Sequence, residues 1–191
     1  MKSADENSRY GRGDGGDRFN AEVKARCARP DETRAAILSR GGVLRGIDQQ
    51  TDTYFVVPKG RLKVREGTIE NSLIAYDRPL EAGVRGSTLV LAILTPAEAA
   101  GMRAVLEAAM PVAARVVKTR EIFFAGNVKL HLDNVEGLGS FVEIEAQCGA
   151  APPDRPALEA QAAQWSDFLG IAPADTIASS YAEMLAPAGG L

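Results

Sequence analysis

Short segments in which charged and apolar residues alternate recur along this chain, and they constrain its fold more than any other feature. Residues 19 to 27 read FNAEVKARC, which puts Glu22, Lys24 and Arg26 on one side of an extended strand and apolar residues on the other. The same alternation gives four further charged sets: Arg61, Lys63 and Arg65; Lys118 and Arg120; Lys129, His131 and Asp133; and Glu143 and Glu145. The pattern predicts an antiparallel sheet with one charged and one apolar face.

The segments between these strands predict the remaining elements. We expect a helix capped by Asp31 and running to about residue 40, followed by a loop that contains residues 48 to 54. An apolar run at 87 to 94 predicts a buried strand, and Thr95 to Glu98 form a capping box that opens a second helix. Two helices are expected near the C-terminus, at about 156 to 169 and 174 to 185.

Length and composition favour a single soluble domain. The chain has 191 residues, and we expect a flexible tail at 1–18, which has no apolar stretch of the kind a secretory signal needs, and one domain at 19–191. It has no apolar run long enough to span a membrane, and its net charge of −3 argues against general nucleic-acid binding. Its two cysteines fall on apolar strand faces, which predicts free thiols and a cytoplasmic protein.

The charged strand faces have two interpretations. Any one of them is explained by ordinary solvent exposure. Like charges recur on the same face, however, and adjacent cations repel unless they surround an anion such as a phosphate chain. A sheet that curls so that these faces point inward forms a charged tunnel. The acidic sets suggest a divalent cation, Mg²⁺ or Mn²⁺, that bridges carboxylates to substrate phosphates.

Several motifs carry a family resemblance. The segments EVKAR (22 to 26) and HLDNVEGLGSFVEIE (131 to 145) resemble the CYTH superfamily, which unites class IV adenylyl cyclases with thiamine and inorganic triphosphatases. The resemblance continues through QTDTYF (50 to 55), GRLKVRE (60 to 66), LIAYDRP (73 to 79), VVKTREIF (116 to 123) and SYAEML (180 to 185). It implies an α+β fold in which a closed antiparallel eight-stranded β-barrel, the triphosphate tunnel, is flanked by helices.

The resemblance also implies roles for individual residues. Glu22 and Glu143 become expected metal ligands, with Glu145 and Asp133 as supporting acids; Asp133 is also a candidate catalytic residue. Lys118 is the other candidate catalytic residue, because an inward lysine beside Arg120 can polarise a phosphate or stabilise a leaving group. The expected substrate ligands are Lys24, Arg26, Arg61, Lys63, Arg65, Arg78, Arg85, Lys118, Arg120, Lys129 and His131. We expect His131 to donate a hydrogen bond inside the barrel rather than to act as a base.

Three reactions and one non-enzymatic function remain open. The motifs resemble the cyclase branch slightly more, which implies conversion of ATP to cyclic AMP and pyrophosphate. The alternatives are hydrolysis of thiamine triphosphate or inorganic triphosphate, loss of pyrophosphate from another organic diphosphate, and binding of a nucleotide or polyphosphate without turnover. Asn20 stands where the family's first motif has an acid, and the 87 to 94 stretch is unusually apolar, which motivates the last two. The resemblance also implies a homodimer.

Overall fold

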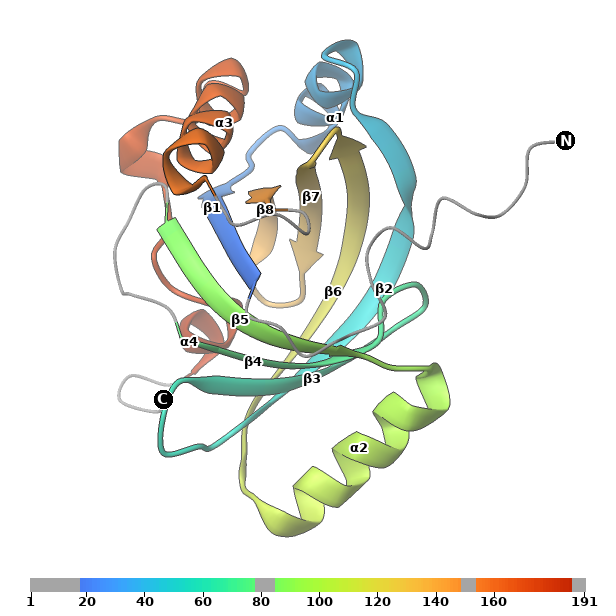
Figure 1. The fold of residues 1–191 in the computed structure, drawn as a ribbon. Coiled ribbons are helices and arrows are strands. Elements are labelled where there is room, and N and C mark those ends of the chain that lie inside the picture. Colours follow the sequence, from blue (N-terminus) through green and yellow to red (C-terminus); the bar gives the residue numbers. More distant parts are fainter. Residues whose placement is uncertain (1–17, 78–84, 149–153, 187–191) are drawn as a thin grey trace, which may run out of the picture.

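Eight antiparallel strands wrap around a central space in the computed structural model, which describes residues 18–77, 85–148 and 154–186 (Figure 1). The strands are β1 (Arg18–Arg26), β2 (Val43–Phe55), β3 (Arg61–Gly67), β4 (Ser72–Asp77), β5 (Arg85–Ile93), β6 (Val112–Ala125), β7 (Val128–Val135) and β8 (Gly139–Gln147). Their order around the sheet is β1-β5-β4-β3-β2-β6-β7-β8, and β1 pairs with both β5 and β8. The sheet is therefore a closed barrel, as predicted.

The helices lie outside the barrel. They are α1 (Pro30–Ser39), α2 (Pro96–Ala109), α3 (Arg155–Phe168) and α4 (Tyr181–Leu185), with a short 3-10 helix at Pro173–Asp175. In Figure 1, α1 and α3 cover one end of the barrel wall, while α2 lies against the opposite end, beneath β3. Among the residues described, no helix has both the length and the apolar composition needed to cross a membrane.

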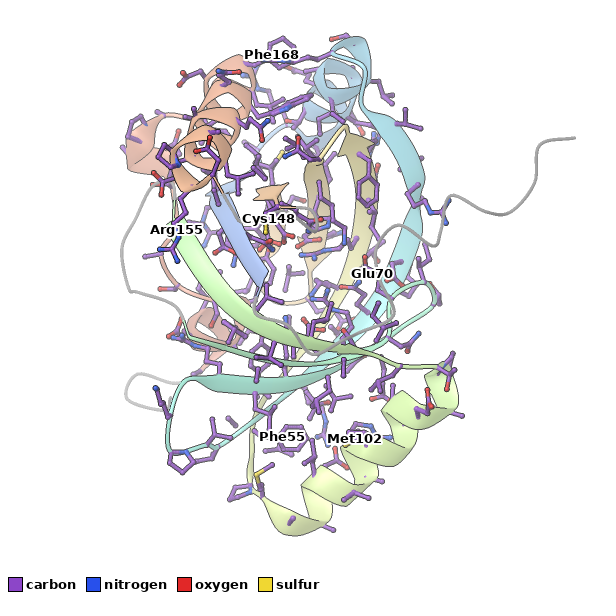
Figure 2. The ribbon with its side chains drawn as sticks, viewed as in Figure 1. Phe55, Glu70, Met102, Cys148, Arg155 and Phe168 are labelled. Atoms are coloured by element: carbon purple, nitrogen blue, oxygen red, sulfur yellow. The ribbon has the colours of Figure 1, made fainter. Side chains whose placement is uncertain are left out.

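The main apolar clusters lie between the barrel wall and these helices. The outward residues of β1, β7 and β8 pack against α1 and α3 around Trp165, which is 7% exposed. A second cluster joins Phe55 and Val64 to α2 through partners that include Met102 (Figure 2). The outward faces are thus covered by helices, whereas a third cluster joins Tyr54, Val116 and Phe141, on the inward faces of their strands, to Tyr181 of α4.

The structure corrects three expectations about local structure. Residues 48 to 54 do not form a loop but belong to β2, where Thr53 and Phe55 are buried against the outer shell. Helix α1 begins at Pro30 and has no side-chain cap, so Asp31 is not its cap. The expected helix at 174 to 185 is divided into the 3-10 turn and α4, because Ser180 begins a new capping box.

Other local predictions are confirmed. Thr95 and Glu98 form the capping box at the start of α2. Gly137 and Gly139 have positive φ angles of 76° and 87°, so they are the turn residues between β7 and β8. Both cysteines are free thiols. Residues 1–17 of the expected tail lie outside the described residues.

Candidate active site inside the barrel

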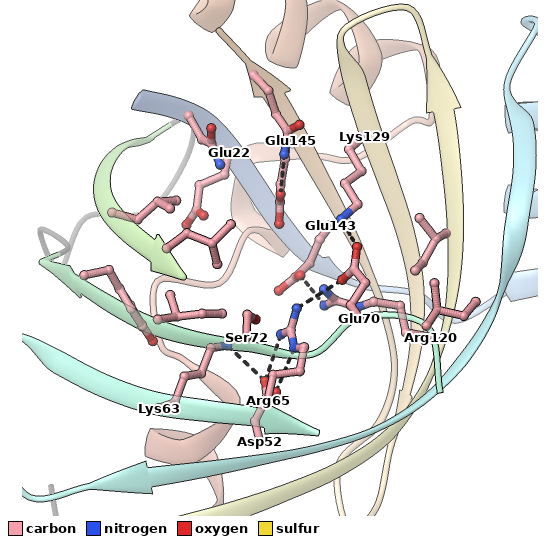
Figure 3. Close-up of a pocket in the computed structure, with 18 of the residues that line it drawn as sticks. Glu22, Asp52, Lys63, Arg65, Glu70, Ser72, Arg120, Lys129, Glu143 and Glu145 are labelled. Carbon is pink, nitrogen blue, oxygen red and sulfur yellow. Dashed lines mark hydrogen bonds and ion pairs between the residues drawn. The ribbon is translucent and has the colours of Figure 1, made fainter. Parts of the chain in front are cut away.

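The barrel contains a cavity of about 440 Å³ whose lining includes many charged side chains (Figure 3). Most strands contribute alternate residues to it, as the alternation in the sequence requires, while β7 contributes Lys129. The predicted site residues that line the cavity are Glu22, Lys24, Lys63, Arg65, Lys118, Arg120, Lys129, Glu143 and Glu145. The strands thus bring together cations and carboxylates that lie more than a hundred positions apart in the sequence.

Three cations meet on one buried carboxylate, that of Asp52, which is 1% exposed. The Nζ atom of Lys63 lies 2.9 Å from its Oδ2, and the Nζ atom of Lys118 lies 2.8 Å from the same oxygen. Arg65 donates from Nε to Oδ1 at 2.8 Å and from a terminal nitrogen to Oδ2 at 2.9 Å. This basic cluster, Lys63, Arg65 and Lys118 around Asp52, has a net positive charge inside the barrel.

The pKa values in this cluster are shifted by burial and by the neighbouring charges. Burial alone would raise the pKa of Asp52, but Arg65, Lys118 and Lys63 outweigh burial and hold it well below its ordinary value. Burial lowers the pKa of Lys118 to about 7; Asp52 opposes this shift, while the neighbouring cations add to it. Lys118 is therefore a buried amine that is only partly charged at neutral pH.

A second ion-pair network crosses β1, β6, β7 and β8. Arg120 donates from Nε to Oδ1 of Asp133 at 2.6 Å and from a terminal nitrogen to Oε2 of Glu143 at 2.6 Å. The Nζ atom of Lys24 lies 3.1 Å from the other oxygen of Glu143. Burial would raise the pKa of Glu143, but Lys24 and Arg120 keep it well below the usual range, so the carboxylate stays ionised.

Three possible metal ligands lie together: Glu143 and Glu145, which were expected to hold a metal, and His131, which was expected to bind substrate. The Nδ1 atom of His131 lies 3.6 Å from Oε2 of Glu143 and 3.6 Å from Oε1 of Glu145, and the three ligand atoms lie within 4.8 Å of one another. His131 is 1% exposed, and neither ring nitrogen has a hydrogen-bond partner among the described residues. Burial, followed by the nearby Arg120, lowers its pKa and favours the neutral imidazole that ligates metals.

These donors fit a divalent cation, because a buried imidazole without a hydrogen-bond partner and two carboxylates point toward one another. Glu22 lies directly opposite Glu145 in the pairing of β1 with β8, so it borders the same group. Asp133 lies outside this group of three donors. Its two oxygens accept bonds from Arg120 and from the hydroxyl of Tyr181, the latter at 2.8 Å.

The C-terminal segment closes one end of the cavity. The backbone nitrogen of Ile177 donates to the carbonyl of Lys24 at 2.8 Å, and the ring of Tyr181 lies against the barrel with Lys24 Nζ 4.1 Å from its centroid. Glu183 of α4 forms an ion pair with Arg61. The segment therefore fixes Tyr181 as part of the cavity lining.

Some predicted ligands lie elsewhere. Arg26 is exposed and donates to the carbonyl of Leu138 at 3.2 Å, and Arg61 is held by Glu183, so neither lines the cavity. His131 and Asp133 are buried behind the cavity surface rather than on it. Arg78 lies outside the described residues, and Arg85 begins β5 with its side chain outside the described part.

The sequence analysis missed two acidic partners. Asp52 is the centre of the basic cluster, and Glu70 pairs with Lys129 and lies 3.4 Å from a terminal nitrogen of Arg65. Asp52 had a usable signal, since the run DQQTDTYF alternates polar residues with threonines and an aromatic ring, as an inward-facing strand does. Glu70 follows β3 in a connecting segment, where no periodicity marks it.

Comparison with known proteins agrees with this architecture. The PH1012 protein from Pyrococcus horikoshii OT3 is 22% identical with a TM-score of 0.73, and the match covers 87% of this chain and 99% of that chain. A conserved hypothetical protein from Pyrococcus furiosus is 18% identical with a TM-score of 0.71, again over 87% of this chain and 99% of the other.

A protein from Vibrio parahaemolyticus, provisionally named an adenylate cyclase, is 21% identical with a TM-score of 0.68 over 87% of this chain and 97% of its own. At these identities the likeness shows the fold alone. No curated protein sequence matches the chain. The model of the CYTH domain matches residues 18–181, which is most of the chain and includes every strand of the barrel. The chain therefore belongs to the CYTH domain family.

Proposed function

We propose that this protein is a metal-dependent enzyme that acts on the phosphate chain of an organic polyphosphate bound inside the barrel. The observation that carries the proposal is the convergence of Lys63, Arg65 and Lys118 on the single carboxylate of Asp52. Three cations against one anion are costly to bury, and a phosphate chain beside them supplies the missing negative charge.

The cationic side chains of the cavity have different roles that depend on their positions. Lys63 and Arg65 of β3 donate hydrogen bonds to phosphate oxygens and fix the phosphate chain against one wall. Lys118, buried between them and Arg120, stabilises the charge that develops on the leaving phosphate, and its pKa of about 7 allows it to give up a proton there.

A divalent cation, Mg²⁺ or Mn²⁺, would be held by Glu143, Glu145 and His131, with Glu22 beside them. When bound, such an ion neutralises charge on the phosphate oxygens and polarises the phosphorus. Glu143 also contacts Lys24 and Arg120, so a residue that would hold the ion adjoins residues that bind phosphate.

Two reactions use this arrangement most directly. In a cyclase, the ribose 3′-hydroxyl of ATP attacks the α-phosphorus and pyrophosphate leaves. In a triphosphatase, water attacks the terminal phosphorus of thiamine triphosphate or inorganic triphosphate, and orthophosphate leaves. The provisional name of the Vibrio parahaemolyticus protein and the sequence motifs favour the cyclase as the first reaction to assay.

The test is turnover by the purified protein. ATP, thiamine triphosphate and tripolyphosphate are incubated separately with Mg²⁺ or Mn²⁺, and cyclic AMP, pyrophosphate and phosphate are followed. We expect at least one product, and its loss in Glu143→Gln but not in the exposed turn variant Glu136→Gln. Binding of all three compounds without any product would exclude both the cyclase and the triphosphatase reaction, and absence of binding would reject the polyphosphate site itself.

A further inference from the structure

One wall of the cavity is formed by neighbouring apolar side chains, beside the part that carries the charged clusters. Ile74 of β4 and Leu89, Leu91 and Ile93 of β5 line it. The intervening residue Val90 is 44% exposed on the outside of the barrel, as the alternation of a strand requires. These four side chains belong to none of the apolar clusters that the described residues form between barrel and helices. The apolar wall, Ile74, Leu89, Leu91 and Ile93, therefore lines the cavity and, among the described residues, takes part in none of these clusters.

Strand pairing connects this wall directly to the cations of β3. Lys63 pairs with Ile74, which pairs with Leu91, so that a cation and a leucine lie two strands apart on the same row. Two further rows repeat this order, one running through Arg61, Tyr76 and Leu89 and the other through Arg65, Ser72 and Ile93. Neighbouring strands are about 4.8 Å apart, so the rows of Lys63 and Arg65 each place an apolar side chain about 10 Å along the wall from a cation that lines the cavity.

We propose that the organic part of the substrate is an apolar group, such as a hydrocarbon chain, that packs on this wall while its phosphates contact the β3 cations. The proposal rests on the proposed function and narrows its substrate to phosphate esters of apolar alcohols. Exposed apolar surface within a cavity of about 440 Å³ is stabilised when an apolar ligand displaces water from it. Among the reactions left open by the sequence, an apolar substrate group supports the loss of pyrophosphate from an organic diphosphate other than a nucleotide.

A nucleoside fits this wall less well. A base and a ribose have donors and acceptors that need partners when they are desolvated. The side chains of Ile74, Leu89, Leu91 and Ile93 have neither donors nor acceptors. The hydroxyl of Tyr76 is engaged with Tyr54 within the lining. A hydrocarbon group loses no hydrogen bonds on this surface.

The experiment measures binding of a series of alkyl diphosphates, ethyl, butyl, hexyl and octyl, by calorimetry in the presence of Mn²⁺. The expected result is an affinity that rises about threefold to fourfold with each buried methylene. Octyl diphosphate is expected to bind more tightly than ADP, which has the same number of phosphates. Leu91→Asn and, at a half-exposed position that tolerates change more easily, Ile93→Asn should each flatten the rise with chain length. The matched control Val90→Asn, on the outside of the same strand, should retain it.

The outcomes separate this inference from the proposed function. Tripolyphosphate, which has no organic part, tests the basic cluster alone. If tripolyphosphate binds but affinity does not change with alkyl chain length, or if ADP binds more tightly than octyl diphosphate, the apolar wall does not select the substrate and the polyphosphate site stands. If the rise persists in Leu91→Asn and Ile93→Asn, the alkyl chains bind elsewhere and the inference is wrong. If tripolyphosphate does not bind at all, the proposed function itself is rejected.

Discussion

The Nζ atom of Lys118 lies 2.8 Å from Oδ2 of Asp52, and each side chain is 1% exposed. A buried pair of this kind usually balances its charges, yet Lys63 and Arg65 reach the same carboxylate. The excess positive charge destabilises the ligand-free protein and creates an anion site. The same contact therefore lowers the stability of the ligand-free protein and favours the binding of an anion.

The first prediction concerns the pH dependence of stability. In the unfolded chain Lys118 titrates near its ordinary value of 10.5, whereas in the folded protein its pKa is about 7. Between these values the unfolded state binds more protons, so the free energy of unfolding contributed by this group increases as the pH rises from 7 toward 10.5. We expect Lys118→Met to remove an increase on the order of 2 kcal/mol between pH 6 and pH 9. Urea unfolding of both proteins at the two pH values measures it, and parallel pH profiles would contradict it.

A second prediction concerns proton uptake on ligand binding. At pH 8 the Lys118 amine is mostly neutral, and a phosphate beside it favours the charged form. At pH 8, binding of tripolyphosphate to the unaltered protein should therefore take up close to one proton more than binding to Lys118→Met. At pH 6 the two proteins should take up almost the same number of protons. Calorimetry in buffers of different ionisation enthalpy gives the difference. Equal uptake by both proteins at pH 8 would show that Lys118 does not face the anion.

The third prediction addresses the metal ligands. If the His131 imidazole ligates together with Glu143 and Glu145, His131→Phe should weaken Mn²⁺ binding about tenfold or more, since loss of a ligand costs at least as much as loss of its supporting contacts. Electron paramagnetic resonance of free Mn²⁺ reads this directly without any substrate. Glu136→Gln, which changes an exposed carboxylate, is the control. An unchanged Mn²⁺ affinity in His131→Phe would show that the imidazole does not ligate the ion.

A fourth prediction tests the closure of the barrel by the C-terminal segment. Tyr181→Phe removes the hydroxyl that donates to the buried Asp133 at 2.8 Å but leaves Arg120 paired with that carboxylate. We expect the free energy of unfolding to fall by about 1 to 2 kcal/mol, as for a buried hydrogen bond to a charged group. Urea unfolding at pH 7 measures the change, and an unchanged midpoint would mean that solvent replaces the hydroxyl.

The alternation of charged and apolar residues predicted which side chains share a strand face, and the recurrence of like charges, together with the family resemblance, predicted that these faces point into the barrel. Lys63, Arg65 and Lys118 could be assigned to the interior because a strand has a period of two and because like charges gather only around an anion. Their partner could not be predicted. Asp52 and Lys118 are 66 positions apart, and only the pairing of β2 with β6 brings them together.

The apolar wall shows a different limit of sequence analysis. The run at 87 to 94 predicts a buried strand. The sequence does not show whether an apolar residue packs against a helix or lines a ligand cavity. Both environments remove Leu91 from water. Only the closed order of the strands, with β5 between β4 and β1, turns this residue toward the cations.

The central claim is that the basic cluster, Lys63, Arg65 and Lys118 around Asp52, binds an anion. The direct measurement is titration of tripolyphosphate with Mn²⁺ into the unaltered protein, Arg65→Met and Lys59→Met, with thermal unfolding to confirm that each is folded. Arg65 is buried beside Asp52, whereas Lys59 is exposed in the turn before β3 and serves as the matched control. We predict that Arg65→Met weakens binding at least tenfold and that Lys59→Met changes it by less than about twofold. Equal weakening by both substitutions, or none by either, would contradict the account.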